Sequence, residues 1–252
     1  MTTFEKLIQI KKSLGAGYFL LIDPDKVEIN KLPDFITNSS EAGVDAFLVG
    51  GSLMLNDELS RILKIIKENT TVPVIIFPGN TSQVSPIADA ILFLMLISGR
   101  NPEFLIGSQV IAAPIIRRAK LEAISTGYML IDGGTVSTTE FMSNTKPIPR
   151  DKIDVVIAHS IAAELIGLKM LYLEAGSGAK ETVPNEMISA VVSACSMPVI
   201  VGGGINTPEK AWQKVEAGAS FVVTGTIIEK NNNISLIKEF ASAIHTLKVT
   251  EI

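Results

Sequence analysis

The chain has 252 residues, of which 47% are hydrophobic, and its formal net charge is −4. This length suits one large α/β domain or two small ones, and the hydrophobic content excludes a disordered chain. The acidic balance argues against a general nucleic-acid binder, which would carry a basic stripe. The single cysteine, Cys195, excludes an internal disulfide, so we expect a reducing, cytoplasmic setting.

The N-terminal segment carries Glu5, Lys11 and Lys12 and has no long apolar core, so no signal peptide is expected. The longest apolar run, residues 90–97, is far shorter than the roughly 20 residues of a membrane-spanning helix. We therefore expect a soluble protein with at most peripheral membrane contact.

Short apolar segments that alternate with amphipathic stretches are the main structural signal along the chain. The segments are almost continuously apolar, which is typical of parallel strands that are covered on both faces. The predicted strands are 18–23, 46–49, 74–77, 91–96, 128–132, 169–174, 198–202 and 221–224. Helical spacing of apolar residues appears between most of them, for example in 57–68 and in 207–217, where Thr207 is the expected N-cap.

The number of strands in a chain of this length predicts a single (β/α)8 barrel over residues 1–252, with a doubly wound open sheet as the alternative. Two regions depart from a regular pattern. The link between the third and fourth predicted strands is short and polar, so a full helix is not expected there. Residues 133–151 are polar and are interpreted as a long functional loop rather than a domain boundary.

Polar residues follow several predicted strands, and the carboxyl ends of the strands are where barrel enzymes place their active sites. Asp23 and Asp25 follow the first strand, where paired carboxylates can bind Mg²⁺ or merely form an Asp-Pro turn. Gly51 and Ser52 follow the second strand, where they form either a ligand-binding turn or an ordinary loop.

The sixth predicted strand ends with Tyr172 and Glu174, which strand alternation places on the same side. A glutamate that faces a barrel interior needs a hydrogen-bonding or ionic partner or a functional role, because burial of an unpaired charge is costly in free energy. The following Gly176-Ser177-Gly178 can wrap an anion with backbone N–H groups. The alternative is a surface loop with an exposed glutamate.

Glycine-rich turns follow the seventh and eighth predicted strands, with Gly203-Gly204 in the first and Gly225-Thr226 in the second. Turns at these two strands form the usual phosphate site of the barrel fold, so the pair predicts a phosphate ligand. His159 and His245 do not form a metal-ligand spacing and are interpreted as incidental, whereas Trp212 and Cys195 are interpreted as packing residues.

Together these segments resemble the geranylgeranylglyceryl phosphate synthases, in the family that also includes the PcrB-type heptaprenylglyceryl phosphate synthases. The resemblance is greatest to the archaeal and Bacteroidetes-type branch and extends from about residue 4 to 245. The segments that carry it are LIDPDK (21–26), GVDAFLVGGS (43–52), TGYMLIDGG (126–134), YLEAGSGA (172–179), VGGGI (201–205) and VTGTIIE (223–229).

The resemblance implies a prenyltransferase that depends on Mg²⁺. Such an enzyme joins the C3 hydroxyl of sn-glycerol 1-phosphate to geranylgeranyl diphosphate through an ether bond and releases diphosphate. A longer heptaprenyl donor is the alternative. The implied fold is a modified TIM barrel in which an extended segment replaces the third helix, and the implied assembly is a homo-oligomer, either a dimer or a hexamer.

The resemblance also assigns residues. Asp23 and Ser52 match the Mg²⁺ positions, and Asp25 is a candidate to join them through water. The sn-glycerol 1-phosphate positions are Tyr172, Leu173, Glu174, Ala175, Gly176, Ser177, Gly178, Gly203, Gly204, Gly225 and Thr226. We interpret Glu174 as the group that accepts the hydroxyl proton and Tyr172 as the residue that orients the glycerol. Leu21 stands where the PcrB-type branch has lysine, so that cationic contact is not expected. Arg100 is either a diphosphate contact or part of a plain loop.

Two other functions share part of the pattern. An isomerase or lyase of sugar phosphates would use the same glycine turns but needs its own acid–base pair, and the strand ends show no lysine or histidine in such a position. A non-catalytic phosphate-binding or scaffold protein would show a degraded site, whereas Asp23, Ser52, Tyr172 and Glu174 are all present.

Overall fold

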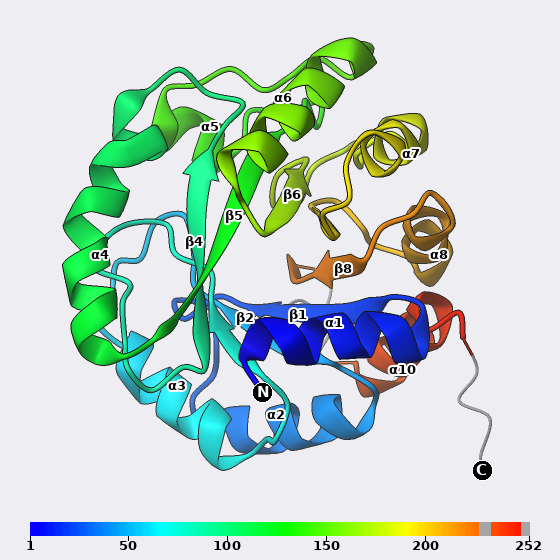
Figure 1. The fold of residues 1–252 in the computed structure, drawn as a ribbon. Helices are drawn as coiled ribbons and strands as arrows, with labels where there is room; N and C mark the ends of the chain where they lie inside the picture. The colour runs from blue at the N-terminus through cyan, green and yellow to red at the C-terminus, as the bar shows by residue number, and fades with distance from the viewer. Residues whose placement is uncertain (227–232, 248–252) are drawn as a thin grey trace.

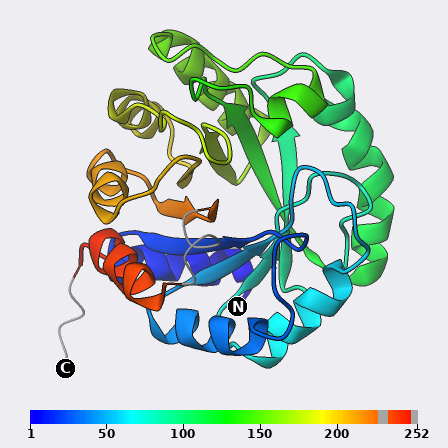
Figure 2. The same ribbon diagram turned by 180° about the vertical axis from the view of Figure 1, so that it is seen from behind.

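The computed structural model describes residues 1–226 and 233–247, and its eight strands are all parallel and form a closed barrel in sequence order (Figures 1 and 2). The strands are β1 (Gly17–Ile22), β2 (Ala46–Val49), β3 (Val74–Ile76), β4 (Ala90–Leu96), β5 (Glu122–Leu130), β6 (Met170–Glu174), β7 (Val199–Gly202) and β8 (Phe221–Thr224). The predicted TIM barrel is confirmed, and the open-sheet alternative is wrong because β8 pairs with β1.

Most predicted strands agree with the observed ones to within one or two residues. The largest difference is in β5, which starts at Glu122, well before the predicted start at Tyr128. The extra part contains Glu122, Ser125 and Thr126 and so lacks the apolar run on which the prediction depended. It is a strand because it pairs along β4, from Ala90 onward.

Helices surround the barrel (Figures 1 and 2). They are α1 (Thr3–Leu14), α2 (Leu32–Glu41), α3 (Leu59–Glu68), the π-helix η1 (Glu103–Gly107), α4 (Ser108–Ala119), α5 (Thr138–Ser143), α6 (Ile153–Ile166), α7 (Asn185–Ala194), α8 (Pro208–Glu216) and α10 (Ile234–Ile244). The Thr207 hydroxyl accepts a hydrogen bond from the backbone N–H of Lys210, which confirms the predicted N-cap of α8.

Two connections determine the shape of the site. Residues 77–89, between β3 and β4, contain no helix, as expected from their polar composition. Residues 133–151, predicted as a loop, contain the short helix α5. Ser137 caps this helix by accepting a hydrogen bond from the backbone N–H of Glu140, a cap that a six-residue helix needs because it has few internal bonds.

Helix α1 closes the amino-terminal end of the barrel. The Glu122 carboxylate accepts hydrogen bonds from the backbone N–H groups of Thr3 and Phe4, and Leu7 is fully buried in the barrel interior. The opposite end, where the strands finish, is therefore the end available to a ligand. No helix in the described residues is long and apolar enough to cross a membrane. The single domain over 1–252 stays a prediction, because 227–232 and 248–252 lie outside the described residues.

Candidate active site

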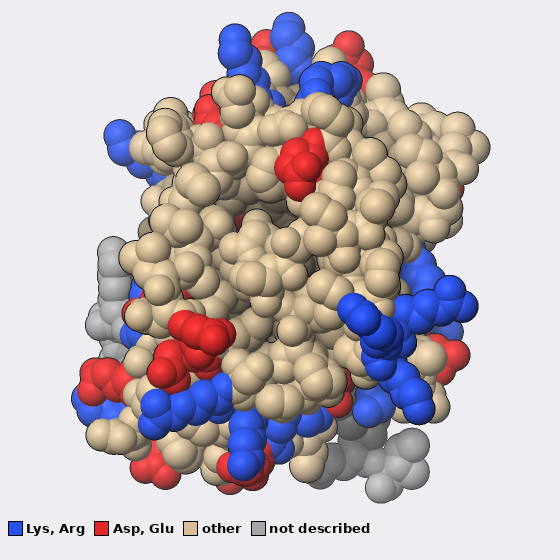
Figure 3. Space-filling view, turned by 90° about the vertical axis from the view of Figure 1, so that its left-hand side faces the viewer, with Lys and Arg blue, Asp and Glu red and all other residues tan. Residues whose placement is uncertain are grey.

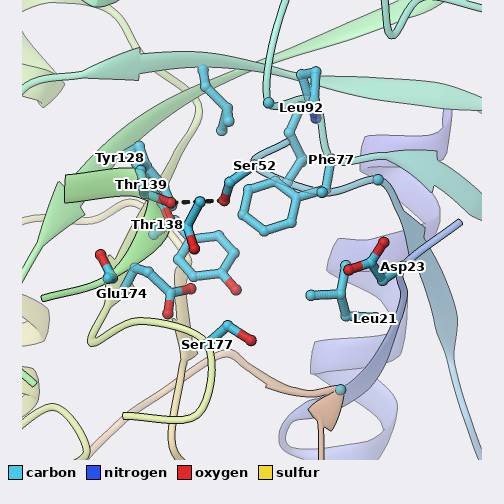
Figure 4. A pocket seen from close by; sticks show the side chains of 18 of the residues that line it. Leu21, Asp23, Ser52, Phe77, Leu92, Tyr128, Thr138, Thr139, Glu174 and Ser177 are labelled. Carbon is cyan, nitrogen blue, oxygen red and sulfur yellow. Dashed lines mark hydrogen bonds between the residues drawn. The ribbon is translucent and has the colours of Figure 1, made fainter. Parts of the chain in front are cut away.

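A cleft of about 600 Å³ opens at the carboxyl ends of the strands (Figure 4). One part is polar and collects residues that follow β1, β2, β6, β7 and β8. The other part is apolar and lies over β4, η1 and α4. Most of the predicted site residues line the polar part, namely Asp23, Ser52, Tyr172, Glu174, Ser177, Gly178, Gly203, Gly204, Gly225 and Thr226. Figure 4 shows Glu174 and Ser177 on one side and Asp23 and Leu21 on the other, with Ser52 and Phe77 between them.

The turns after β6 and β7 pack against each other through their backbones. Gly203 has a φ of +81°, and a Cβ at this position would lie 2.3 Å from Glu174 Oε1 and 2.5 Å from the Gly176 carbonyl oxygen. Only glycine fits this conformation and this spacing. Ser177 and Thr226 join the turns after β6 and β8 through a 3.0 Å hydroxyl hydrogen bond. Glycine turns of this kind expose backbone N–H groups that can bind a phosphate.

Glu174 is buried and has partners. Its Oε1 accepts a 2.6 Å hydrogen bond from the backbone N–H of Gly176, and the Tyr172 hydroxyl also donates to its carboxylate. Burial raises the pKa of Glu174 from 4.5 to about 7, although both hydrogen bonds act in the opposite direction. A carboxylate with a pKa near neutrality is well suited to accept and return a proton.

Tyr172 is fixed by aromatic neighbours. Its ring stacks on Phe77 with centroids 5.2 Å apart, and Tyr128 meets it edge-on at 5.3 Å. Burial, and after it the negative charge of Glu174, raises the pKa of the Tyr172 hydroxyl well above its ordinary value, so the hydroxyl stays protonated and donates to Glu174. The predicted alternation of Tyr172 and Glu174 into the barrel is confirmed, and the alternative of an exposed glutamate is wrong.

The side chains of two other predicted site residues, in the segment that begins with β6, face away from the cleft. Leu173 and Ala175 are buried between the barrel and its helices, so their side chains face away from the cleft. Neither lines the cleft. Any contact of these two residues with a ligand would therefore have to come from their peptide groups.

Two further oxygen donors line the polar part, Asp23 on the side opposite Glu174 and Ser52 between them (Figure 4). The Asp23 carboxylate is largely buried, accepts the Asp25 backbone N–H, and pairs with the Lys26 ammonium at 2.7 Å. Ser52 Oγ lies 2.9 Å from Thr139 Oγ1 (Figure 4). No cluster of three His, Cys, Asp or Glu side chains that could hold a metal occurs in the described residues. One carboxylate and one hydroxyl fit Mg²⁺, which keeps several waters and completes its shell with phosphate oxygens.

Asp25 binds backbone and side-chain groups of the loop after β2 and not the proposed metal site. Its carboxylate accepts hydrogen bonds from the backbone N–H of Leu55 at 2.7 Å and from the backbone and side chain of Asn56 at 3.3 and 3.0 Å. These bonds, the one from Leu55 first, lower the pKa of Asp25. Asp25 does not line the cleft. The structure therefore does not support the expectation that Asp25 joins the metal site, because its carboxylate fixes the loop after β2.

Arg100 also lies outside the cleft lining. Its guanidinium donates to the carbonyl oxygens of Gly99 at 2.7 Å and Ile97 at 3.4 Å, and it lies 3.3 Å from His159 Nε2 on α6. These contacts favour the plain-loop interpretation of Arg100 over a diphosphate contact.

Several lining residues were not predicted from the sequence. Lys26 is the only lysine or arginine that lines the cleft within the described residues. Thr138 and Thr139 come from α5, which the sequence did not predict. The apolar part is formed by Val84, Ile91, Phe93, Phe104, Ala112 and Ile116, among others. The one signal for this part in the sequence was the apolar run 91–96, which indicated a buried strand whose end could also form the floor of a groove for a hydrocarbon tail.

A family model described as the PcrB family matches residues 8–244. The chain belongs to the PcrB family. Its relatives include a geranylgeranylglyceryl phosphate synthase of Chitinophaga pinensis, 47% identical over 236 residues, with 93% of each chain covered. The corresponding protein of Methanosphaera stadtmanae is 42% identical, with 90% of this chain and 93% of the relative covered.

Solved structures agree with the family. The crystal structure of (S)-3-O-geranylgeranylglyceryl phosphate synthase from Thermoplasma acidophilum, in complex with its substrate sn-glycerol-1-phosphate, superimposes with a TM-score of 0.92 at 33% identity. The match covers 98% of this PcrB-family chain and 100% of the other. A thiamine phosphate pyrophosphorylase from Pyrococcus furiosus matches with a TM-score of 0.60 at 13% identity, which shows the shared barrel fold alone.

Proposed function

We propose that this PcrB-family protein is a geranylgeranylglyceryl phosphate synthase, which joins sn-glycerol 1-phosphate to geranylgeranyl diphosphate. The observation that carries the proposal is the two-part cleft, in which glycine turns suited to a phosphate lie beside an apolar region suited to a hydrocarbon chain. The relatives named as synthases support the same reaction. Formation of the ether product from purified protein tests the proposal.

The reaction breaks the C1–O bond of the allylic diphosphate and forms a C–O bond between C1 and the C3 hydroxyl oxygen of the glycerol. The hydroxyl proton passes to the Glu174 carboxylate, and diphosphate leaves. Tyr172, held by its aromatic neighbours, fixes the carboxylate that accepts this proton. The phosphate, bound by the turns after β6, β7 and β8, holds the hydroxyl in place, and such positioning accounts for much of the rate.

Charge balance supports a divalent cation in this reaction. The two substrates together bring several negative charges into a cleft where Asp23 and Glu174 are acidic and Lys26 supplies the one side-chain cation among the described lining residues. Asp23 and Ser52 are the residues that would hold Mg²⁺. When bound, Mg²⁺ neutralises charge that develops on the leaving diphosphate.

A sugar-phosphate isomerase or lyase fits the structure less well. Such an enzyme would bind its phosphate at the glycine turns, but the apolar part of the cleft would then have no function. A non-catalytic phosphate-binding protein would have no use for a buried glutamate whose pKa is raised to about 7 beside an ordered tyrosine.

We assign the reaction to the cytoplasm, consistent with the one thiol of the chain being a free, half-buried cysteine.

Donor length depends on the apolar part of the cleft. Phe104 lines it from η1, and we infer that its ring limits the length of the chain that the cleft can hold. We expect Phe104→Ala to raise kcat/KM for a C25 donor relative to a C20 donor by about tenfold, the scale on which apolar pockets discriminate chain length. Competition between the two donors measures the ratio. Phe141→Ala, which removes an exposed ring outside the cleft lining, is the control, and an equal change in both variants would contradict the assignment.

Self-association is proposed through the outer face of α4. Val110, Ile111 and Ile115 on this face are 39–63% exposed, on a side of the molecule whose charged residues lie mostly at its edges (Figure 3). Exposed apolar groups clustered in this way mark interfaces. In an antiparallel pair of α4 helices related by a two-fold axis, Glu103 of one copy would face the basic last turn of the other, which contains Arg117 and Arg118.

We expect Ile111→Glu to shift the protein from an oligomer to a smaller species, measured by light scattering after gel filtration. Leu165→Glu, at an 84% exposed position on α6, is the matched control and should leave the mass unchanged. A fall in mass with the Leu165 variant alone would place the interface on α6 and contradict the proposal.

A further inference from the structure

The segment that replaces a helix between β3 and β4, residues 77–89, buries two polar side chains. Gln83 and Ser85 are each 1% exposed. Ser85 lies 3.2 Å from Ser60 Oγ on α3, outside the cleft. Gln83 points the other way, toward the turn after β2 that carries Ser52. A buried polar side chain is costly unless its hydrogen bonds are satisfied, so the partners of Gln83 show what its burial achieves.

The Gln83 amide is bonded to the backbone of two turns. Its Nε2 donates to the Gly51 carbonyl oxygen at 2.9 Å, and its Oε1 accepts from the backbone N–H of Gly79 at 3.1 Å. The backbone N–H of Gly51 makes a longer contact of 3.5 Å with the same oxygen. Because a neutral amide donates and accepts at once, it can join two peptide groups without bringing a charge into the site.

The two turns approach each other so closely that only glycine fits at their points of contact. A Cβ on Gly79 would lie 2.2 Å from the Gly51 carbonyl oxygen and 2.8 Å from Ser52 Cα. A Cβ on Gly50, whose φ is +150°, would lie 2.1 Å from the Phe77 carbonyl oxygen. Within residues 1–226 and 233–247, Gln83 makes the hydrogen bonds to the Gly51 peptide groups.

The same turn supports both proposed Mg²⁺ residues. Ser52 belongs to it, and a Cβ on Gly51 would lie only 3.3 Å from Asp23 Oδ1, so the carboxylate rests against the backbone of the turn. We infer that Gln83 is a positioning residue for the diphosphate subsite, because it fixes the Gly50–Gly51–Ser52 backbone against which Asp23 lies and from which Ser52 projects. The inference rests on the proposed function and adds to it a residue that does not itself line the cleft.

The test compares Gln83→Met, which keeps the length of the side chain and removes its hydrogen bonds, with Ser85→Ala. The control residue is equally buried in the same segment but bonded away from the cleft. Calorimetric titration with inorganic pyrophosphate in the presence of Mg²⁺ measures the diphosphate subsite without catalysis. We expect Gln83→Met to raise this Kd and the KM for the prenyl donor by about tenfold, the scale of a lost buried hydrogen bond. The KM for sn-glycerol 1-phosphate should stay within about twofold, and Ser85→Ala should change neither constant.

An unchanged pyrophosphate Kd in a folded Gln83→Met protein overturns the inference, and so does an equal loss of affinity for both substrates or an equal effect of Ser85→Ala. If the Gln83 variant does not fold, hydrogen exchange of the wild-type protein decides. Slow exchange of the Gly79 amide, which donates to Gln83 Oε1 at 3.1 Å, is expected without ligands, and exchange at the rate of a free loop overturns the inference. Failure of the proposed function is distinguishable, because the wild-type protein would then form no ether product whatever the Gln83 variant binds.

Discussion

Glu174→Gln is expected to lower kcat by about 10²–10⁴-fold, the usual contribution of a positioned general base, with little change in either KM. The amide keeps the shape of the carboxylate and can still accept the 2.6 Å hydrogen bond from Gly176. It cannot take the hydroxyl proton. Steady-state kinetics with both substrates measures the change, and Tyr172→Phe, which removes the hydroxyl that donates to Glu174, should give a smaller loss in kcat.

The pH dependence of kcat gives a second measurement of the same role. Since burial raises the pKa of Glu174 to about 7, the wild-type kcat should rise with pH through this region as the carboxylate loses its proton. The rise should be absent in Glu174→Gln. A variant with near-native kcat, or with the wild-type pH profile, would show that another group takes the proton.

The same pKa shift affects stability. The pKa of Glu174 is higher in the folded protein than its ordinary 4.5, so the folded state holds this proton more tightly than the unfolded chain does. The resulting stabilisation is complete below about pH 4.5 and is lost as the pH rises through about 7. The difference in the free energy of unfolding between wild type and Glu174→Gln should therefore move in favour of the glutamine variant between pH 5 and 8.

Asp23→Asn is expected to lower kcat/KM for the prenyl donor by about 10²–10³-fold and to raise the Mg²⁺ concentration that gives half-maximal activity. Asparagine keeps the size of the side chain and can accept the backbone hydrogen bond from Asp25, but it removes the charge that would bind a cation and that pairs with Lys26. A magnesium titration of initial rates measures the shift. The KM for sn-glycerol 1-phosphate should change far less.

Asp25→Asn is the matched control, because Asp25 lies two residues away and its carboxylate is bonded to Leu55 and Asn56 outside the cleft lining. It should leave the magnesium curve unchanged and lower the melting temperature slightly. A larger magnesium shift for the Asp25 variant than for the Asp23 variant would contradict the assignment of the two carboxylates.

Strand positions were predictable because both faces of a barrel strand are buried, which leaves uninterrupted apolar runs such as Ala46–Val49 and Phe221–Thr224. The first two thirds of β5 were not predictable, because residues 122–127 form a strand through pairing with β4 rather than through their own composition. Helix α5 was missed for a similar reason, since it is short and depends on the cap from Ser137.

The polar half of the site was largely predictable, since strand alternation places Tyr172 and Glu174 together and the glycine turns are visible in the sequence. The residues that the sequence did not reveal act across segments. Gln83 joins the turns after β2 and β3, and Thr139 reaches Ser52 from a helix far along the chain. Asp25 and Asp23 look equivalent in the sequence, and only the position of Leu55 and Asn56 separates their roles.

A turnover assay with the two enantiomers of glycerol phosphate tests the synthase activity most directly. Purified protein with Mg²⁺ and geranylgeranyl diphosphate would receive either sn-glycerol 1-phosphate or its sn-3 enantiomer. We expect ether product and diphosphate from the sn-1 form alone, with no product after addition of EDTA. The absence of product with donors of any chain length, from protein that is folded and binds glycerol phosphate, would contradict the synthase assignment.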